Sequence, residues 1–330
     1  MIILNDFYQY SSERYLQEKA EKKEIRFIGT VMGLGIIGYV ILQTLFGDLF
    51  LSGFLGRLAT IDPAFNCVAT IFLSLIGLLI PFGICGVAVG RRTGKRIWNF
   101  EKPVSIPLML AAVPFGFFVC LAGNYVTSWF VNFMDGAGVE LTAPEFAVPD
   151  DFAGRILYIV TIAVVPALVE EFAIRGAVMQ PLRRYGDKFA IVASALFFGI
   201  LHGNLIQAPF AVIAGIAIGY AVCITNSLWT GILIHFANNL YSVFTEFMIQ
   251  DISDLEVLDA VYTISSVTLT VISVLGSVVF ILLKSNRKLM PSFTVASEKT
   301  KMLAFILNIP MIIAIIIMLV ITSWFVSTGG

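Results

Sequence analysis

The sequence has few charged residues for its length. Asp, Glu, Lys and Arg make up 13% of its 330 residues, whereas a soluble globular domain carries about 25%. Hydrophobic residues account for 58%. This composition excludes an ordinary soluble domain and predicts an integral membrane protein. The formal net charge is −1, so the chain lacks the basic excess that a nucleic-acid partner requires.

Cysteine and histidine are scarce as well. The four cysteines are isolated in apolar stretches without a CxxC pair, which is typical of small buried residues; they are Cys67, Cys85, Cys120 and Cys223. The first 26 residues lack the apolar run of a signal peptide. We interpret residues 1–26 as a charged, water-exposed helical arm. His202 and His235 are the only histidines, so any imidazole chemistry depends on these two residues.

Long apolar runs fill the rest of the chain. A spanning helix needs about 20 mostly apolar residues, and this criterion predicts an all-α, polytopic transmembrane bundle of about eight or nine spans. The expected spans lie near 27–46, 66–90, 105–130, 154–181, 189–204, 208–225, 228–249, 260–283 and 303–325. We divide the chain into the arm, N-terminal helices with an outer loop, a core and C-terminal helices, at 1–26, 27–153, 154–249 and 250–330.

Basic residues concentrate in alternate loops. If the N-terminus is cytoplasmic and nine spans alternate, the cytoplasmic segments hold 18 of the 21 Lys and Arg residues. They include Lys95 and Arg96 in the 91–103 loop. Acidic residues gather in the opposite loops, as at Asp150 and Asp251. The positive-inside rule therefore predicts a cytoplasmic N-terminus. The overall style of the sequence favours a bacterial plasma membrane.

Ionisable side chains inside the predicted spans are costly and need a partner or a function. Glu170 and Glu171 are adjacent in the fourth span, and Glu171 shares a helix face with Arg175, four residues on. An ion pair between Glu171 and Arg175 would partly offset their burial. Glu170 has no such local partner, which makes it the candidate general base. Pro166 would free the carbonyl group of Ile162.

The two histidines lie on later spans. His202 ends the sequence Phe-Gly-Ile-Leu-His, and His235 shares a helix face with Asn239, whereas Asn238 is expected to point elsewhere. At about 1.5 Å of rise per residue, all these groups and Glu170 lie about 14 to 21 Å from the cytoplasmic ends of their helices. Any one of them alone is more often a helix–helix hydrogen bond. Their agreement in depth favours a functional site.

A carboxylate, two imidazoles and a carboxamide suit hydrolysis by activated water. Glu170, helped by His202, would deprotonate the water, and His235 with Asn239 would donate hydrogen bonds to the oxyanion. No serine or cysteine nucleophile has a recognisable setting. Glu170, His202 and His235 could instead hold a zinc ion, although the HExxH motif is absent. The residues alone leave metal-activated and Glu/His-activated water as alternatives.

The motifs EExxxR at Glu170–Arg175, FxxxH at Phe198–His202 and HxxxN at His235–Asn239 together resemble the CAAX protease and bacteriocin-processing family. The resemblance covers about 154–249. It implies an intramembrane endopeptidase of a family commonly classed as metalloproteases. In it Glu170 and His202 would activate water, His235 and Asn239 would stabilise the oxyanion, and Glu171 and Arg175 would support the site. We expect the active site in the cytoplasmic half of the bilayer.

The resemblance implies membrane lipids and a peptide or protein substrate as partners, either lipidated or of the bacteriocin-leader type. Two other functions stay open. One is a non-catalytic bacteriocin self-immunity or scaffold protein, in which the motifs serve packing or binding. The other is a proton-coupled transporter, because glutamate and histidine also build proton relays. The lack of an internal repeat argues against the transporter.

Overall fold

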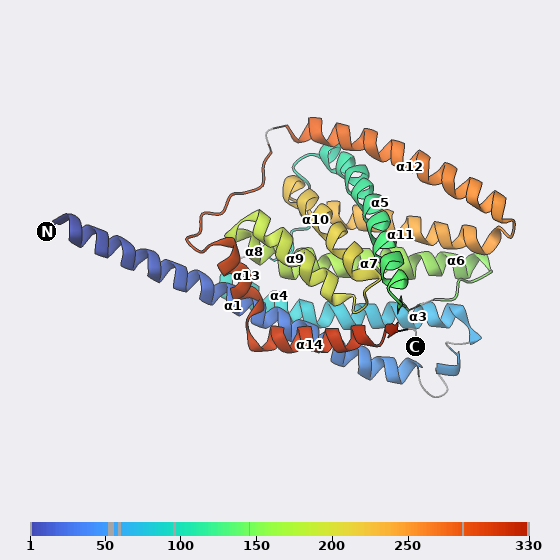
Figure 1. Ribbon diagram of the computed structural model, residues 1–330, viewed down its shortest axis with the longest axis horizontal. Helices are drawn as coiled ribbons and strands as arrows, with labels where there is room; N and C mark the ends of the chain where they lie inside the picture. The colour runs from blue at the N-terminus through green and yellow to red at the C-terminus, as the bar shows by residue number, and fades with distance from the viewer. Residues whose placement is uncertain are drawn as a thin grey trace.

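The computed structural model describes residues 2–51, 56–58, 61–94, 97–144, 146–285 and 287–328. Lys95 and Arg96, which the loop analysis assigns to the cytoplasmic side, lie outside these ranges. The described chain is a bundle in which most helices run along the long axis of the molecule and α5 crosses them steeply (Figure 1). The expected all-α, polytopic membrane fold is confirmed.

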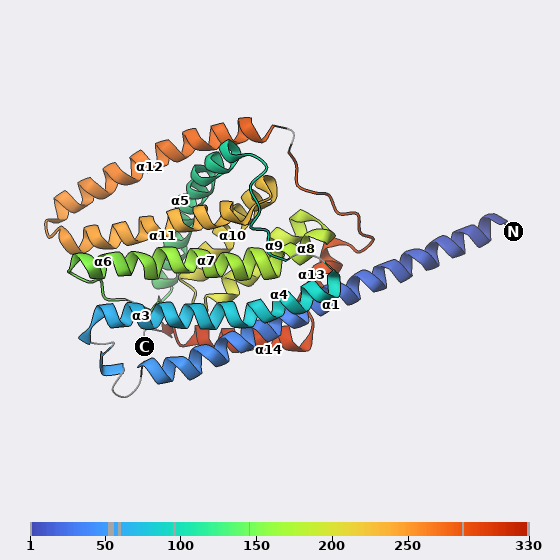
Figure 2. The same cartoon turned by 180° about the vertical axis from the view of Figure 1, so that it is seen from behind.

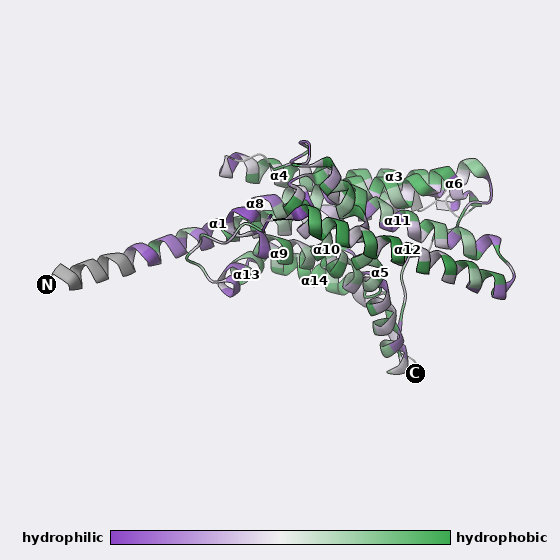
Figure 3. Cartoon of the chain, turned by 90° about the horizontal axis from the view of Figure 1, so that it is seen from above, coloured by the Kyte–Doolittle hydropathy of each residue, from purple (hydrophilic) through white to green (hydrophobic). Residues whose placement is uncertain are grey.

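The N-terminal half begins with one continuous helix, α1, which combines the charged arm and the first apolar run (Figures 1 and 2). In Figure 3 the described part of the arm is largely hydrophilic, whereas the bundle is largely hydrophobic. The helices of this half are α1 (Ile2–Leu51), α3 (Pro63–Ser74), the π-helix η1 (Leu75–Leu79), α4 (Ile80–Thr93) and α5 (Ile106–Gly136).

The glutamate-bearing span is one helical run with two π-helical stretches: α6 (Phe152–Ile159), η2 (Val160–Val164), α7 (Val165–Glu171), η3 (Phe172–Met179), α8 (Gln180–Leu182) and the 3-10 turn η4 (Arg183–Tyr185). The next helices are α9 (Asp187–Leu201), α10 (Gln207–Thr225), α11 (Leu228–Asp251) and α12 (Leu255–Lys284). Helix α10 packs against α9, α5 and α11, and α11 packs against α7. The glutamate and histidine helices are therefore neighbours.

Local signals set most helix ends. Side chains of Asp151, Asp254 and Ser297 accept hydrogen bonds from backbone N–H groups at the starts of α6, α12 and α13 (Glu298–Ile306), which satisfies donors that a helix leaves open. Helix α10 ends at Asn226 in the left-handed region, with φ 54°. The short turn that follows brings α11 back antiparallel to α10.

By length and composition, six helices of the described chain could cross a membrane, or up to seven if a bent pair counts as one span. That pair is α13 and α14 (Ile309–Ser323), bent by 74°; the sequence suggested one uninterrupted span over 303–325. Two other expected spans are not among the six. Helix α9 has 15 residues, short of the roughly 20 required. Helix α11 carries many polar side chains.

A two-stranded antiparallel sheet joins the outer loop to the C-terminal segment. Strand β1 (Val139–Leu141) pairs with β2 (Val326–Thr328), with Glu140 opposite Ser327. The sequence analysis did not anticipate this pair. It ties the end of α5 to the end of α14, so the C-terminal helices are anchored at both of their ends.

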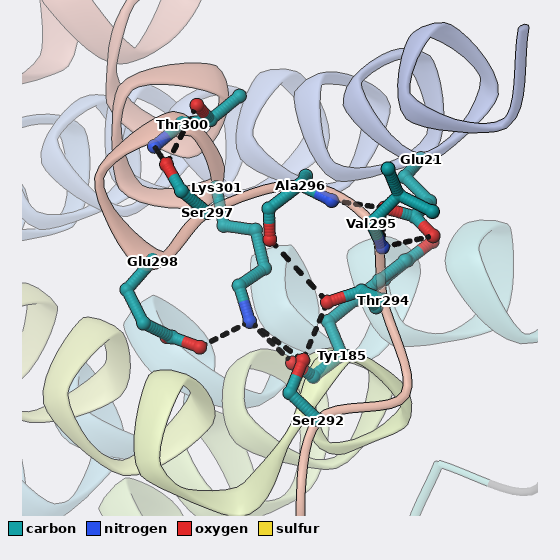
Figure 4. Close-up of polar contacts among 10 residues, drawn as sticks. All are labelled: Glu21, Tyr185, Ser292, Thr294, Val295, Ala296, Ser297, Glu298, Thr300 and Lys301. Atoms are coloured by element: carbon teal, nitrogen blue, oxygen red, sulfur yellow. Dashed lines mark hydrogen bonds and ion pairs between the residues drawn. The ribbon is translucent and has the colours of Figure 1, made fainter. Parts of the chain in front are cut away.

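The other anchor of the C-terminal helices is a polar cluster at the basic end of the bundle (Figure 4). Lys301, fully buried, donates hydrogen bonds to the backbone oxygen of Tyr185 at 2.8 Å, to Ser292 at 3.0 Å and to Glu298. The Glu21 carboxylate of α1 accepts from the backbone N–H groups of 295 and 296. We call this group, centred on Lys301, the Lys301 clasp. It joins α1 and α13 to the end of the glutamate-bearing helix.

Candidate active site

The backbone around Pro166 links two helices of the site. Because proline has no N–H group, the carbonyl oxygen of Ile162 lacks its usual helical partner. The side-chain amide of Asn239 donates to this oxygen at 3.0 Å. The carbonyl that the sequence analysis expected to be free therefore fixes α11 against the glutamate-bearing helix, and one of the two N–H bonds of the Asn239 amide is used for this purpose.

Glu171 is the centre of a buried hydrogen-bond network. Glu171 and Arg175 are both 0% exposed, and Arg175 Nη1 donates to Glu171 Oε1 at 2.8 Å. This is the ion pair expected from their spacing. The same oxygen lies 3.0 Å from Nδ1 of His235, a contact that the sequence did not predict. Because a carboxylate accepts, the His235 Nδ1–H group donates, and Glu171 sets the orientation of the imidazole ring.

Glu170 lies on the other side of the same imidazole. Its Oε2 atom is 3.7 Å from His235 Nε2, and its side chain is 22% exposed. The ring of His235 is thus flanked by two carboxylates, one fully buried and one with access to solvent. Glu171 Oε2 is buried without a hydrogen-bond partner, whereas Glu170 lines the cavity and can meet a substrate water. The pair of adjacent glutamates therefore divides into a reactive carboxylate and a positioning carboxylate.

His202 follows the last residue of α9. Its Nδ1 atom lies 2.8 Å from the backbone oxygen of Phe198; because a carbonyl only accepts, Nδ1 carries the proton and Nε2 is left as an acceptor. The Phe198 ring packs against both histidines, with centroid distances of 4.6 Å to His202 and 6.0 Å to His235. It also lies 5.0 Å from the Arg175 guanidinium. Phe198 therefore positions several groups of the site.

One cavity of about 1080 Å³ brings the predicted groups together. Glu170, His202, His235 and Asn239 all line it. Asn238 lines it too, which corrects the expectation that this side chain points elsewhere. Helix α11 therefore contributes residues from more than one helix face to the cavity wall. Asn238 donates to the Asn239 side-chain oxygen at 3.2 Å. Arg175 and Glu171 are not among the lining residues and support the site from behind.

Residues 152–241, which contain all three motifs, match the family model described as type II CAAX prenyl endopeptidase Rce1-like. This segment is therefore similar to the CAAX protease family. No curated protein and no solved structure matches the chain. The match supports a CAAX-type intramembrane endopeptidase in general, and the matched segment carries Glu170, His202, His235 and Asn239 of the cavity wall.

Gly231 is a residue of the candidate site that sequence reasoning missed. It lies one turn before His235, and a Cβ atom at this position would be 2.5 Å from Glu171 Oε2. The absence of a side chain lets α11 approach the buried carboxylate closely. The available signal was the spacing: a glycine four residues before a motif histidine lies on the same helix face.

The donor arrangement of the candidate site does not fit a complete zinc site. Within the described ranges, no group of three or more His, Cys, Asp or Glu side chains is placed to hold a metal ion. His235 Nε2 and Glu170 Oε2 converge at 3.7 Å, but a protein zinc site takes three or four such donors. Each histidine does present a free Nε2 and a bonded Nδ1, so the two rings are oriented toward the cavity.

Proposed function

We propose that this protein is an endopeptidase that cleaves a membrane-associated protein or peptide within the bilayer, by water that Glu170 and His202 activate. One observation carries the proposal: a carboxylate and two imidazoles from three helices line a single cavity in a part of the chain where such groups are otherwise too costly to bury. The family match at residues 152–241 supports the same reaction class.

In the proposed reaction, a water molecule lies between Glu170 and Nε2 of His202. Glu170 removes a proton as the water oxygen attacks the peptide carbonyl carbon, and the C=O bond becomes a C–O⁻ oxyanion. The C–N bond then breaks, the carbonyl re-forms as a carboxyl group, and the leaving nitrogen takes the proton from Glu170. Glu171 and Arg175 act as positioning residues that hold His235.

Asn239 and His235 are the proposed oxyanion donors. Asn239 retains one amide N–H beyond the bond to Ile162. His235 donates to Glu171 through Nδ1, so it can donate to an oxyanion only when Nε2 also carries a proton. Asn238 is a further donor on the same wall.

The proposed mechanism uses no metal-dependent step. A bound zinc ion would supply Lewis-acid activation of the water, but the donor arrangement described above is incomplete for it. We therefore propose water activation by side chains alone. Incubation of the purified protein with 1,10-phenanthroline, followed by measurement of peptide cleavage and of bound metal, tests this point. A stoichiometric metal whose removal abolishes cleavage would contradict it.

We propose that the N-terminus and the basic loops face the cytoplasm, in a bacterial plasma membrane, with the reactive groups in the cytoplasmic half of the bilayer. The proposed substrates are peptides held in or at the membrane, among them lipidated tails and bacteriocin-type leaders.

The decisive experiment compares membrane peptides from cells that carry the wild-type protein, Glu170→Gln or His202→Ala. The Glu256→Gln variant is a control that changes an exposed carboxylate outside the cavity. We expect cleavage products to disappear in the first two variants and to persist in the control. Full retention of the products or of the cellular phenotype in Glu170→Gln would favour a scaffold or immunity protein instead.

A further inference from the structure

The cavity extends from the reactive groups toward only one end of the bundle. Beyond the site it is lined by Pro144, Phe146 and Val148 and by the last turns of α11, including Glu246, Ile249 and Gln250. Toward the other end the path is filled: Ile174, Val178 and Met179 of η3 are fully buried, as expected for close-packed interior side chains. The cavity therefore extends away from η4 and toward the C-terminal end of α11, which lies at the right-hand end of the bundle in Figure 1.

The open end is acidic. Asp150 and Asp251 lie there, and Arg155 is already held by Asp251 through two hydrogen bonds of 2.6 and 2.5 Å. Gln250, on the cavity wall, donates to Asp150. A carboxylate-rich mouth raises the local concentration of cationic groups and repels anionic ones.

Glu246 is the carboxylate on the cavity wall itself. It is part-buried and accepts one hydrogen bond, from the Tyr158 hydroxyl at 2.7 Å. Among the described residues it forms no ion pair. Elsewhere on the cavity wall, the side-chain oxygens of Thr127 and Asn238 are buried and have no hydrogen-bond partner, with their residues 9% and 6% exposed. Buried polar atoms of this kind are normally satisfied, so the wall offers unused polar groups along its length.

We infer that the substrate peptide enters from this acidic end and that Glu246 binds a cationic group of the entering segment. The inference rests on the proposed endopeptidase function and names its substrate class. Eleven residues separate His235 from Glu246 on α11, about 16 Å of helical rise. An extended peptide covers that distance in about five residues. The preferred substrate thus carries Lys or Arg about five residues from the cleaved bond.

Binding can be measured without turnover by using the Glu170→Gln protein in nanodiscs. The probe is an apolar 20-residue peptide with one lysine about five residues from its centre, compared with the same peptide carrying glutamine. We expect the lysine peptide to bind about tenfold more tightly. The preference should vanish when Glu246→Gln is added and persist when Glu256→Gln is added. Equal affinities for both peptides in the Glu170→Gln protein would overturn the inference.

Entry is tested by blocking each end of the otherwise wild-type protein. Ile249→Cys places a thiol at the mouth, where Ile249 is 61% exposed; Lys288→Cys places one in a separate cavity at the basic end. The four native cysteines are buried. Labelling Ile249→Cys with a bulky maleimide should reduce cleavage at least tenfold. Labelling Lys288→Cys with the same reagent should leave cleavage unchanged. The opposite pattern, or equal effects, would contradict entry from the acidic end.

The two proposals fail differently. If Glu170→Gln still cleaves the lysine peptide while Glu246 controls its binding, the Glu170 mechanism is wrong and the cation site stands. If Glu170→Gln abolishes cleavage but Glu246→Gln leaves the lysine preference intact, the proposed endopeptidase function is kept. The proposed binding of a cationic group by Glu246 is then wrong.

Discussion

His235 owes its orientation to a carboxylate that does not line the cavity. Its Nδ1–H group donates to Glu171 at 3.0 Å, which directs Nε2 toward Glu170. In the Glu171→Gln variant, the amide NH2 group can face the ring and favour the other tautomer. By analogy with carboxylate-to-amide changes beside a catalytic histidine, we expect kcat to fall by about 10²- to 10⁴-fold.

Two measurements separate this positioning role from a loss of folding. The thermal unfolding midpoint of the purified Glu171→Gln protein should fall, because the buried charge of Arg175 loses its carboxylate partner, so kcat is compared at a temperature at which the variant is folded. The loss should then fall on kcat and not on KM, because the His235 ring is misoriented while the rest of the cavity wall is unchanged. An unchanged kcat in the folded variant would show that Glu171 serves packing only.

Gly231 makes a second prediction about a single side chain. Alanine favours a helix over glycine by about 1 kcal/mol, yet its Cβ would lie 2.5 Å from Glu171 Oε2, and overpacking typically costs about 1–3 kcal/mol. We expect Gly231→Ala to lower the unfolding midpoint and kcat/KM together. Gly83→Ala is the matched control, because its nearest neighbour would be 4.0 Å away. Equal behaviour of the two variants would refute the close-approach argument.

The Lys301 clasp sets how the last helices attach to the core. Lys301 caps the backbone oxygen of Tyr185, at the corner between the glutamate-bearing helix and α9. In Lys301→Met this buried oxygen loses its donor, which costs about 1–3 kcal/mol. We expect a lower unfolding midpoint for the detergent-solubilised variant. Lys299→Met, a change at an exposed lysine on the same helix, should leave the midpoint unchanged; a comparable drop would contradict the assignment.

Local spacing predicted some of these elements and long-range contacts determined the rest. The Glu171–Arg175 pair follows from i,i+4 geometry alone, and so does the shared helix face of His235 and Asn239. The His235–Glu171 contact and the position of Asn238 on the wall depend on how α11 is rotated against α7, which no local pattern encodes. The bend before α14 did have a signal: Asn308 caps that helix, and Pro310 occupies its first turn. The run of apolar residues concealed it.

The orientation of the whole bundle decides the biological meaning of the acidic entrance. The turn η4 and the described segments that follow α4 and α12 lie at the left-hand end of Figure 1, and the cavity extends toward the C-terminal end of α11 at the other end. If the positive-inside rule holds, peptides reach the site from the non-cytoplasmic side, although the reactive groups themselves lie within the membrane. The depth of the reactive groups in the bilayer therefore does not fix the side from which the peptide enters.

We therefore predict that an impermeant maleimide added to intact cells labels a cysteine at position 256 and spares one at position 19. Glu256 lies at the start of α12 near the cavity mouth, and Lys19 lies in the exposed part of α1. The buried native cysteines supply little background. Permeabilised cells should label both positions, which controls for reactivity. Labelling of position 19 alone in intact cells would show that the bundle has the opposite orientation, with the acidic entrance facing the cytoplasm.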